Sequence, residues 1–553
     1  MRVIVLSGRG NVGKTHCLGH LINLMYRKTT GCDCVIEGKD VRISLKYLGK
    51  HIVVCTWGDN YYEEQENLDF ISRFNPDIAI IATRLKGSTV KMVQRFCKDN
   101  SYHLKQVEKF VVNSKDESEQ EYINHLQAKQ MLDYIHDVIE GRLYYVDSIT
   151  ENGENRYHVT LLGTEMPDDG FPRTLSLQLN ANQILNYGAE YRIQEDDFVL
   201  YRPDSENLLL LANDMPRATE LRNESRALRQ ELMERELTDE ATLAPNRKGL
   251  EWVKSYHVNV GHGNCSLILT KYESGYDLWM VDCSTYDYLI RRDYSMDLLQ
   301  CLKDIATDVD IDIHNLRISR FMLTHTHFDH YNGLLYLKKQ GVIDGTTLMY
   351  INLHYDCASP VWSAILKDLK AMKCRFIEPV SDKVRLGIIE IYHPECRLYK
   401  DNRSVPAEMK NSVRVVPNAN NASVVYGINL IGKIMVLPGD LERQGFKKMS
   451  GLKKCSPFIY HPNYYIISHH GSINGHPIIP CMNPYPNQPR RPLDCMSRRN
   501  SKVILMGRNG AYPGIYSPLV ENYWKRLCGG LFYTEKAPHY LELDWISGKV
   551  TPK

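Results

Sequence analysis

The fold of the C-terminal half is decided by one stretch, Ile318-Ser-Arg-Phe-Met-Leu-Thr-His-Thr-His-Phe-Asp-His-Tyr-Asn-Gly-Leu-Leu-Tyr-Leu337. Its first seven residues form an apolar run that is typical of a buried strand, and the segment that begins at Tyr331 has helical spacing. Three histidines and an aspartate therefore lie in the turn between a strand and a helix.

This turn carries the ligand types that hold divalent metal ions in proteins. In an extended loop, residues two positions apart project to the same side, so His325 and His327 could bind one ion. Asp329 and His330 then turn toward a second ion. Imidazole and carboxylate ligands suit zinc, manganese or iron, and catalytic sites of this kind keep a position open for water.

Further motifs occur in a fixed order on both sides of this turn. They are Tyr256-His-Val-Asn-Val-Gly-His-Gly-Asn-Cys-Ser-Leu-Ile-Leu269, Leu278-Trp-Met-Val-Asp-Cys283, Asn420-Asn-Ala-Ser-Val-Val425, Val436-Leu-Pro-Gly-Asp-Leu-Glu442, Tyr465-Ile-Ile-Ser-His-His-Gly-Ser472 and Val503-Ile-Leu-Met-Gly-Arg-Asn509. With H-x-H-x-D-H after a strand, the series resembles the metallo-β-lactamase fold, and more particularly the hydrolase domain of ComEC-type DNA-uptake proteins. The resemblance covers roughly residues 252 to 546 and implies an αββα sandwich with hydrolase activity.

The resemblance also implies roles for later residues. Asp440 would bridge two metal ions, and either His469 or His470 would complete the second site. His469 is favoured as the ligand because it ends the strand, which leaves His470 as a catalytic side chain, although the spacing does not separate the two. Asp282 would orient a ligating histidine, or else satisfy backbone groups at a strand end.

The sequence departs from the family pattern at several positions. His262 and Asn264 replace a glutamine and an aspartate of the opening turn, and Ser517 replaces a histidine near the end of the pattern. No separate third ligand for the first ion is evident, since His393 is better explained by a structural role. The site could therefore hold one ion or two.

The expected chemistry follows from the ions and from the carboxylate beside them. Divalent zinc or manganese activates water for attack on an electrophilic carbon or phosphorus and stabilises the negative charge that develops. Asp329 could act both as a ligand and as a proton acceptor. The expected activity is hydrolysis.

A basic segment after the H-H-G-S motif bears on the substrate. It contains Arg490, Arg491, Arg498, Arg499 and Lys502, which could contact phosphates, although a solvated surface loop is the more common explanation of such a composition. The resemblance to DNA-uptake proteins points the same way. Nucleic acid is the favoured substrate, and a small ester, thioester, lactam or nucleotide is the alternative.

A phosphate-binding motif lies near the N-terminus. Gly8-Arg-Gly-Asn-Val-Gly-Lys-Thr15 matches G-x-x-x-x-G-K-[ST] between an apolar strand and a helix, as a Walker A loop requires. Backbone N–H groups would cradle the phosphates, Lys14 would neutralise them, and Thr15 would hold magnesium. The residues expected to bind nucleotide in this loop are Gly8, Gly10, Asn11, Gly13, Lys14 and Thr15.

The remainder of the N-terminal region fits a nucleotide-binding domain. Apolar runs at residues 2–7, 51–57 and 77–83 alternate with helical stretches, which predicts a doubly wound α/β domain. Asp59, after the second run, could contact magnesium through water, or could be a plain turn carboxylate. No guanine-selecting N-K-x-D motif is evident, so ATP is favoured over GTP.

The whole chain of 553 residues is too long for one core and is expected to be an α/β multidomain protein. The expected parts are a P-loop domain at 1–141, a small β module at 142–215, a charged helical linker at 216–248 and the hydrolase domain at 249–553. A formal net charge of +2 does not by itself indicate nucleic-acid binding, and 15 cysteines without a regular framework fit reduced thiols in a cytoplasm. The sequence contains no secretory signal pattern and no apolar run long enough to span a membrane.

The favoured function is a two-metal phosphodiesterase or nuclease, coupled to or regulated by the ATP-binding domain. A hydrolase of small molecules is the first alternative. The second is a nucleotide-gated binding protein with a degenerate hydrolase domain, against which the intact set of candidate ligands speaks. Partner proteins and the oligomeric state stay open.

Overall fold

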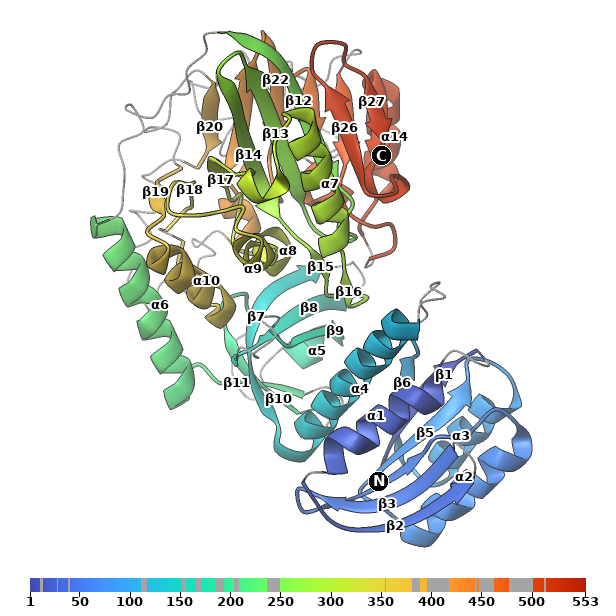
Figure 1. Ribbon diagram of the computed structural model, residues 1–553. Helices are drawn as coiled ribbons and strands as arrows, with labels where there is room; N and C mark the ends of the chain where they lie inside the picture. Colours follow the sequence, from blue (N-terminus) through green and yellow to red (C-terminus); the bar gives the residue numbers. More distant parts are fainter. Residues whose placement is uncertain are drawn as a thin grey trace, which may run out of the picture. The chain divides into compact units, whose positions relative to one another are not determined.

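The computed structural model describes residues 1–9, 13–26, 28–37, 40–110, 117–151, 156–165, 172–184, 193–202, 208–235, 249–353, 355–379, 388–394, 418–442, 445–446, 462–476, 501–511 and 514–553. Two compact units divide the chain, one formed by Met1–Arg142 with Leu200–Leu210 and the other by Leu143–Val199 with Leu211–Lys553. Both contain helices and mixed sheets (Figure 1). The prediction of an α/β multidomain protein is confirmed at this level.

The first unit contains a six-stranded sheet of β1 (Arg2–Gly8), β2 (Thr29–Glu37), β3 (Asp40–Tyr47), β4 (Lys50–Cys55), β5 (Ile78–Arg84) and β6 (His103–Glu108). The strand order is β2-β3-β4-β5-β1-β6. β4, β5, β1 and β6 are parallel, and β3 pairs antiparallel with both β2 and β4.

Helices cover both faces of this sheet because side chains of a strand point alternately to opposite faces. Ile4 and Leu6 of β1 pack on α1 (Lys14–Tyr26) and α4 (Glu117–Glu140). Val3 and Val5 pack on the opposite face with α2 (Tyr61–Phe74) and α3 (Ser88–Asp99). The first unit is therefore a three-layered α/β/α structure.

A small sheet, which we call the β module, follows the first unit's six strands in the chain, and most of its residues belong to the second unit, whereas Leu200–Leu210 belong to the first. β7 (Arg142–Glu151) pairs with β8 (Arg156–Gly163), and β8 pairs with β9 (Thr174–Asn180). The strand order is β11-β10-β7-β8-β9, and the chain after β9 forms α5 (Ala181–Ile184), β10 (Phe198–Arg202) and β11 (Leu208–Leu211).

The charged segment after the β module forms α6 (Pro216–Arg235). One face of this helix is buried, because Ala218, Leu221, Leu228 and Leu232 recur at helical spacing and join the main core of the second unit. The prediction of a solvated helix therefore describes only the opposite face.

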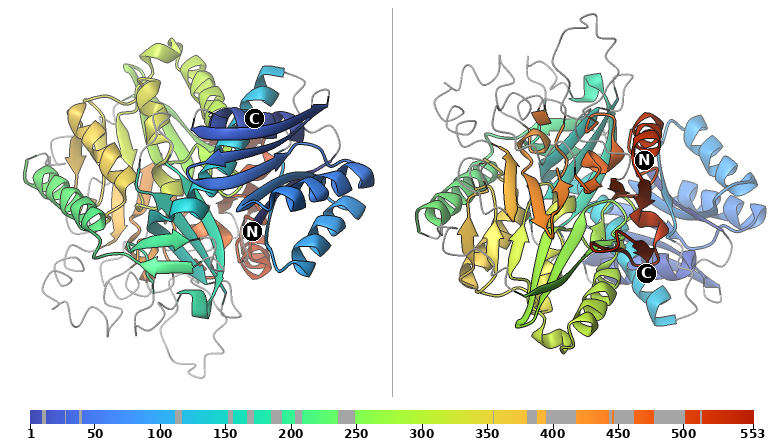
Figure 2. Two further views of the ribbon diagram at one scale, coloured as in Figure 1. Left: turned by 90° about the horizontal axis from the view of Figure 1, so that it is seen from below. Right: turned by 90° about the horizontal axis from the view of Figure 1, so that it is seen from above.

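Two larger sheets form the body of the second unit (Figures 1 and 2). The eight-stranded sheet has the order β19-β18-β17-β14-β13-β12-β26-β27, and the six-stranded sheet has the order β20-β21-β22-β23-β24-β25. The first consists of β12 (Leu250–Val258), β13 (Cys265–Tyr272), β14 (Gly275–Cys283), β17 (Arg320–Met322), β18 (Leu348–Tyr350), β19 (Arg375–Ile377), β26 (Tyr540–Asp544) and β27 (Val550–Pro552). The second consists of β20 (Ile389–His393), β21 (Val425–Leu430), β22 (Lys433–Leu437), β23 (Tyr464–Ile466), β24 (Lys502–Leu505) and β25 (Gly530–Tyr533). A two-stranded ribbon of β15 (Tyr286–Asp287) and β16 (Arg292–Asp293) accompanies them.

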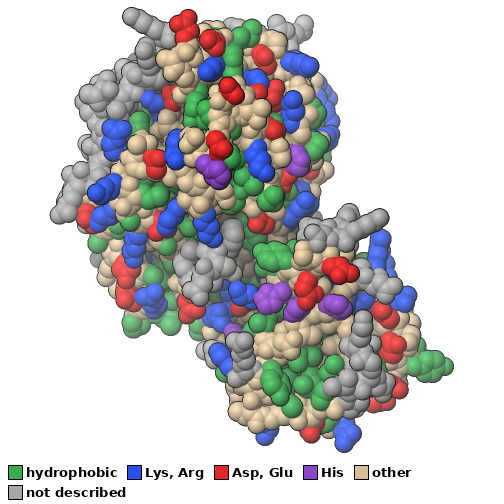
Figure 3. Space-filling view, in the orientation of Figure 1, with side chains coloured by type: hydrophobic (Ala, Val, Ile, Leu, Met, Phe, Trp, Pro, Cys, Tyr) green, Lys and Arg blue, Asp and Glu red, His purple; other side chains and the backbone are tan. Residues whose placement is uncertain are grey.

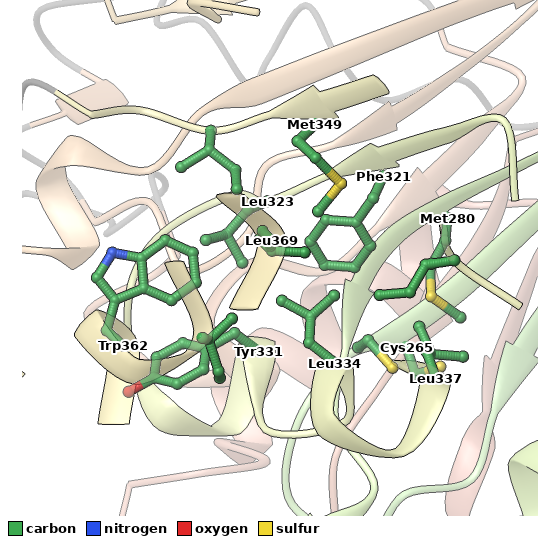
Figure 4. Packing of buried hydrophobic residues seen from close by; sticks show 14 of the residues in the cluster. Cys265, Met280, Phe321, Leu323, Tyr331, Leu334, Leu337, Met349, Trp362 and Leu369 are labelled. Carbon is green, nitrogen blue, oxygen red and sulfur yellow. The ribbon is translucent and has the colours of Figure 1, made fainter. Parts of the chain in front are cut away.

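Apolar side chains fill the space between these two sheets and cover their outer faces. Trp279 and Met322 of the larger sheet share one core with Tyr426 of the smaller sheet. α7 (Ser295–Asp308), α9 (Leu334–Lys339) and α10 (Pro360–Ala371) pack on the outer face of the larger sheet, and α14 (Pro518–Leu527) packs on the smaller one. Figure 4 shows Leu334 of α9 next to Phe321 of the sheet, and Trp362 of α10 next to Tyr331.

This layering brings the carboxyl ends of parallel strands from both sheets to one edge. β14, β17 and β18 are parallel, and so are β22, β23 and β24, so the loops at their carboxyl ends meet. Short helical turns occupy two of these loops, namely α8 (Phe328–Tyr331) after β17 and η4 (Ser468–Gly471) after β23, and a third turn, η3 (Asn420–Ala422), precedes β21. None of the described helices combines the length and the apolar character that a bilayer-spanning segment needs.

Candidate metal centre

Four side chains from three loops meet at the carboxyl ends of the strands. Asp329 and His330 follow β17, Asp440 follows β22 and His470 follows β23. Each offers one ligand atom, and these atoms all lie within 4.8 Å of one another. All four residues are buried, so the group can hold a metal ion.

Three distances within this group are close to those of tetrahedral coordination. Nε2 of His330 lies 3.3 Å from Oδ1 of Asp440. Nε2 of His470 lies 3.3 Å from Oδ2 of Asp329 and 3.4 Å from Oδ2 of Asp440. Zinc bonds of about 2.0–2.2 Å at tetrahedral angles place neighbouring ligand atoms about 3.3–3.6 Å apart. Nε2 of His330 lies farther from Oδ2 of Asp329, at 3.9 Å, and the two histidines contact different oxygens of Asp440, so the side chains would move closer together to hold a single ion tetrahedrally.

Buried charge is concentrated in the group. Burial raises the pKa of the Asp440 carboxyl, but His470, His330 and His469 outweigh it and hold that pKa well below its usual value. Burial opposes protonation of His330, whereas Asp440, Asp282 and Asp329 raise its pKa well above the usual range. The carboxylates therefore stay ionised, and ionised carboxylate oxygens are what a hard or borderline cation binds.

Asp282, at the end of β14, forms hydrogen bonds with His330 of the four-residue group and with the neighbouring Thr324. Its Oδ2 lies 2.8 Å from Nδ1 of His330, and its carboxylate accepts hydrogen bonds from the backbone N–H and the hydroxyl of Thr324, both at 2.8 Å. A histidine held at Nδ1 presents Nε2 to the group. This is the orienting role considered for Asp282 from the sequence.

His325 and His327 lie beside the four-residue group without joining it. The ring of His325 is 4.1 Å from that of His330 and 4.7 Å from that of His327, centroid to centroid. Nε2 of His325 is buried and has no hydrogen-bond partner among the described residues, and its Nδ1 lies 3.1 Å from the Thr324 hydroxyl. His325 thus has a ligand atom free.

The two histidines of the H-H-G-S turn have different surroundings. Both adopt left-handed backbone conformations, with φ of 51° at His469 and 49° at His470. His470 belongs to the four-residue group, whereas the ring nitrogens of His469 lie 3.9 Å from Asp440 and 3.8 Å from Glu442. Two adjacent non-glycine residues with positive φ are strained, and such strain is often found at functional sites.

Three residues at the centre had no assigned role in the sequence. Nε2 of His262 lies 3.2 Å from Oδ2 of Asp329, although His262 was recognised only as a departure from the family motif. Oε2 of Glu195 lies 3.7 Å from Nε2 of His327, and Oδ2 of Asp147 accepts a hydrogen bond from the backbone N–H of Phe328 at 3.2 Å. Glu195 and Asp147 belong to the β module, where no motif marks them.

Other predicted residues have structural surroundings. Nε2 of His393 lies 3.0 Å from the carbonyl oxygen of Asn421, and Ser517 precedes α14 at its N-terminus. Of the basic segment, Arg490, Arg491, Arg498 and Arg499 lie outside the described residues, and Lys502 begins β24.

In the first unit, the phosphate-loop residues lie between β1 and α1. Gly8 ends β1, Gly13 has a φ of 82°, and Lys14 and Thr15 begin α1, while Gly10 and Asn11 lie outside the described residues. Nζ of Lys14 donates to the carbonyl oxygens of Gly8 at 3.3 Å and Arg9 at 2.9 Å.

Asp59 belongs to the same surroundings. Its Oδ1 lies 3.0 Å from Nζ of Lys14 and 3.9 Å from Nε of Arg84. The structure therefore brings the lysine of the motif and the predicted magnesium-contacting carboxylate together.

No protein-family model matches the sequence, and no curated protein matches it.

Proposed function

We propose that this chain is a metal-dependent hydrolase of phosphodiester bonds in DNA or RNA, whose N-terminal unit binds ATP and Mg²⁺ and regulates it. The observation that carries the proposal is the buried group of Asp329, His330, Asp440 and His470. Buried charges are stable only when they are paired or coordinate a metal, and two carboxylates facing two imidazoles offer both. We take this group as the reaction centre.

The architecture supports assignment to the metallo-β-lactamase fold. Two stacked sheets carry helices on their outer faces, and the candidate ligands follow β17, β22 and β23 at one edge. The motifs that resemble ComEC-type hydrolase domains occupy these loops. The resemblance is the reason for preferring nucleic acid as the substrate class.

When bound, divalent zinc or manganese supplies Lewis acidity, which activates water and stabilises negative charge on a phosphoryl oxygen. Asp440 reaches both histidines of the group through its two oxygens, so it suits a bridging position. Asp329 is ionised, because His330, His470 and His262 hold its pKa far below the usual value against the effect of burial, which suits a metal ligand. It would accept a proton only from water that the bound ion has made more acidic. His470 lies next to Asp329 and would stabilise the carboxylate in that role.

The first unit supports ATP binding through the loop after β1. Lys14 is held at the mouth of this loop by Gly8, Arg9 and Asp59, and would exchange these partners for phosphate oxygens. Thr15, at the first turn of α1, would contact Mg²⁺. Nucleotide binding would then change the hydrolase activity.

A second candidate rests on a small pocket beside His325. Its lining includes Leu323, Tyr355, Ala419 and Ala422, so its walls are largely apolar. Its volume of about 10 Å³ admits only a water-sized molecule, so a small ester, thioester or nucleotide base would require the pocket to open. The surface in Figure 3 intersperses basic and acidic side chains, which favours neither candidate.

The test measures cleavage of single- and double-stranded DNA and RNA by the full chain with zinc or manganese, with and without ATP. Asp440→Asn should abolish cleavage, whereas Asp310→Asn, the same change at an exposed residue, should not. Cleavage that persists in Asp440→Asn would refute the proposed centre. If the wild-type protein contains bound metal and cleaves none of these nucleic acids, the small-molecule substrate would become the favoured one.

A further inference from the structure

The β module reaches the candidate metal centre through one turn, residues 193–197. Glu195 is the residue of this turn that approaches the histidines, and its side chain is 10% exposed. Its Oε2 lies 3.7 Å from Nε2 of His327. A carboxylate from outside the two large sheets thus borders the H-x-H-x-D-H turn.

Backbone groups fix the carboxylate of Glu195. Oε1 accepts a hydrogen bond from the N–H of Ile149 at 3.3 Å, and Oε2 accepts one from the N–H of Ala419 at 3.4 Å. The two donors come from different parts of the second unit, since Ile149 lies in β7 and Ala419 precedes η3. The side chain is therefore positioned before any ligand binds.

Hydrogen bonds hold the turn at 193–197 against the loop after β18, which contains Tyr355, and against Tyr145 of β7. The hydroxyl of Tyr355 donates to Oδ2 of Asp196 at 2.8 Å, and the hydroxyl of Tyr145 donates to Oδ1. The N–H of Asp196 donates to the carbonyl oxygen of Val146 at 2.9 Å, and the N–H of Gln194 donates to Asp197 at 2.7 Å. These contacts keep Glu195 next to His327.

Asp147 positions the backbone on the histidine side of the contact between Glu195 and His327. It is buried, and its Oδ2 accepts the hydrogen bond from the N–H of Phe328, the residue after His327. This bond holds the backbone that carries His327 against the β module. Asp147 is thus a positioning residue for the histidine.

His325 and His327 form an incomplete donor set without this turn. Their rings meet edge to face 4.7 Å apart, and Nε2 of each is buried without a hydrogen-bond partner among the described residues. Apart from Asp440, which could be shared with the first ion, the motifs of the two large sheets offer these histidines no separate third ligand, and Nε2 of His393 lies 3.0 Å from the carbonyl oxygen of Asn421 instead. Two imidazoles and a carboxylate form a donor set that zinc, manganese and iron accept.

We propose that Glu195 is the third protein ligand of a second divalent ion, which His325 and His327 also bind. Glu195 Oε2 lies 3.7 Å from His327 Nε2, slightly beyond the spacing of about 3.3–3.6 Å that ligands of one ion adopt. The ligand atoms of Glu195, His325 and His327 do not all lie within 4.8 Å of one another, so these side chains would move closer together when the ion binds. The inference rests on the proposed function only in placing this ion beside the first. It makes the β module part of the centre.

The experiment counts metal ions in the purified full chain after loading with Zn²⁺ and desalting, and records the visible absorption of the Co²⁺-loaded protein. Wild type should retain two ions per chain. Glu195→Gln should retain one, because losing a ligand weakens the second ion by more than the about 10–100-fold typical of groups that only orient ligands. Glu165→Gln, which removes an exposed carboxylate of the same module, should retain two.

Glu195→His provides the second variant, because it restores a ligand without the original charge. It should regain the second ion and show a shifted Co²⁺ spectrum. One ion in wild type, or two ions in Glu195→Gln with unchanged affinity, would overturn the assignment. Loss of the second ion in Glu195→Gln from a protein that cleaves no substrate would leave this inference standing and refute only the proposed hydrolase function.

Discussion

Asp282 fixes the ring of His330 from behind, with its Oδ2 2.8 Å from Nδ1 of the histidine. Nε2 on the opposite side of the ring lies 3.3 Å from Asp440. The carboxylate that orients the ring and the carboxylate that shares its proposed ion thus belong to different sheets, since Asp282 ends β14 and Asp440 follows β22. Metal affinity should depend on Asp282 although it is not itself in the four-residue group.

Replacement of Asp282 by asparagine should weaken zinc binding by about 10–100-fold. The amide keeps the shape of the side chain but loses the charge that favours a proton on Nδ1 of His330. Competition with a chromophoric chelator measures the affinity. Asp310→Asn should bind zinc as wild type does, and an equal affinity in Asp282→Asn would show that the bond to His330 does not tune the ligand.

Gly439 should tolerate no side chain, because a Cβ there would lie 2.5 Å from the side chain of Thr324. Its φ is 57°, and Asp440 follows it directly. We expect Gly439→Ala to displace Asp440 and to lower metal affinity at least about 10-fold as well as stability. The matched control is Gly432→Ala, which has a φ of 71° but no atom within 4 Å of the new Cβ. Equal metal affinity in the two variants would contradict the steric argument.

His257 should make the second unit sensitive to acid. Burial between Ser255 and Ser266 lowers its pKa from 6.5 to about 3, so the folded chain keeps the ring neutral where the unfolded chain binds a proton. The free energy of unfolding should therefore be highest above pH 6.5 and fall toward pH 3 by up to about 1.4 kcal/mol per pH unit from this group.

Denaturant titrations in a chelating buffer, at several pH values, test this expectation. His257→Gln should show a shallower loss of stability on acidification than wild type. His314→Gln, at an exposed histidine, should follow wild type. Parallel pH profiles for wild type and His257→Gln would refute the assignment.

Lys14→Ala should weaken ATP binding by roughly 10–100-fold, because charge-assisted hydrogen bonds to phosphate contribute about 1.5–3 kcal/mol. Calorimetric titration with ATP and Mg²⁺ measures the loss. The exposed lysine Lys91 on α3 supplies the control, and Lys91→Ala should bind ATP normally. Unchanged affinity in Lys14→Ala would remove the loop after β1 from the nucleotide site.

Features with a local signature could be predicted from the sequence. The apolar run from Ile318 to Thr324 contains β17, and the runs at 2–7, 51–57 and 77–83 correspond closely to β1, β4 and β5. These strands are buried, so their composition carries the signal. How the strands are arranged in sheets depends on pairing between distant segments and has no comparable signature.

The spacing of residues in the sequence does not show which of His469 and His470 points into the four-residue group. His469 is favoured from the sequence as the residue that ends the strand, but β23 ends at Ile466, and both histidines lie in the left-handed region of backbone conformation. The structure places His470, rather than His469, among the four grouped side chains. The direction of each ring follows from backbone dihedrals that the sequence does not reveal.

Glu195 and Asp147 were unpredictable for a different reason. Neither belongs to a motif, and their partners His327 and Phe328 are more than a hundred residues away in the chain. Only tertiary packing of the β module gives them a role. His262 carried a weak signal, because a histidine had replaced a glutamine within a motif of known position.

The same packing sets an order in time during synthesis. The ribosome adds Glu195 132 residues before His327, which at about 5–20 residues per second is an interval of about 7–26 s. Throughout this interval the turn at 193–197 lacks its histidine neighbour and the Tyr355 hydroxyl, whereas Tyr145, Val146 and Ile149, which also contact it in the folded chain, have already been added. Addition of a strong chelator to a translation reaction should therefore leave the nascent β module unaffected until His327 has left the ribosome.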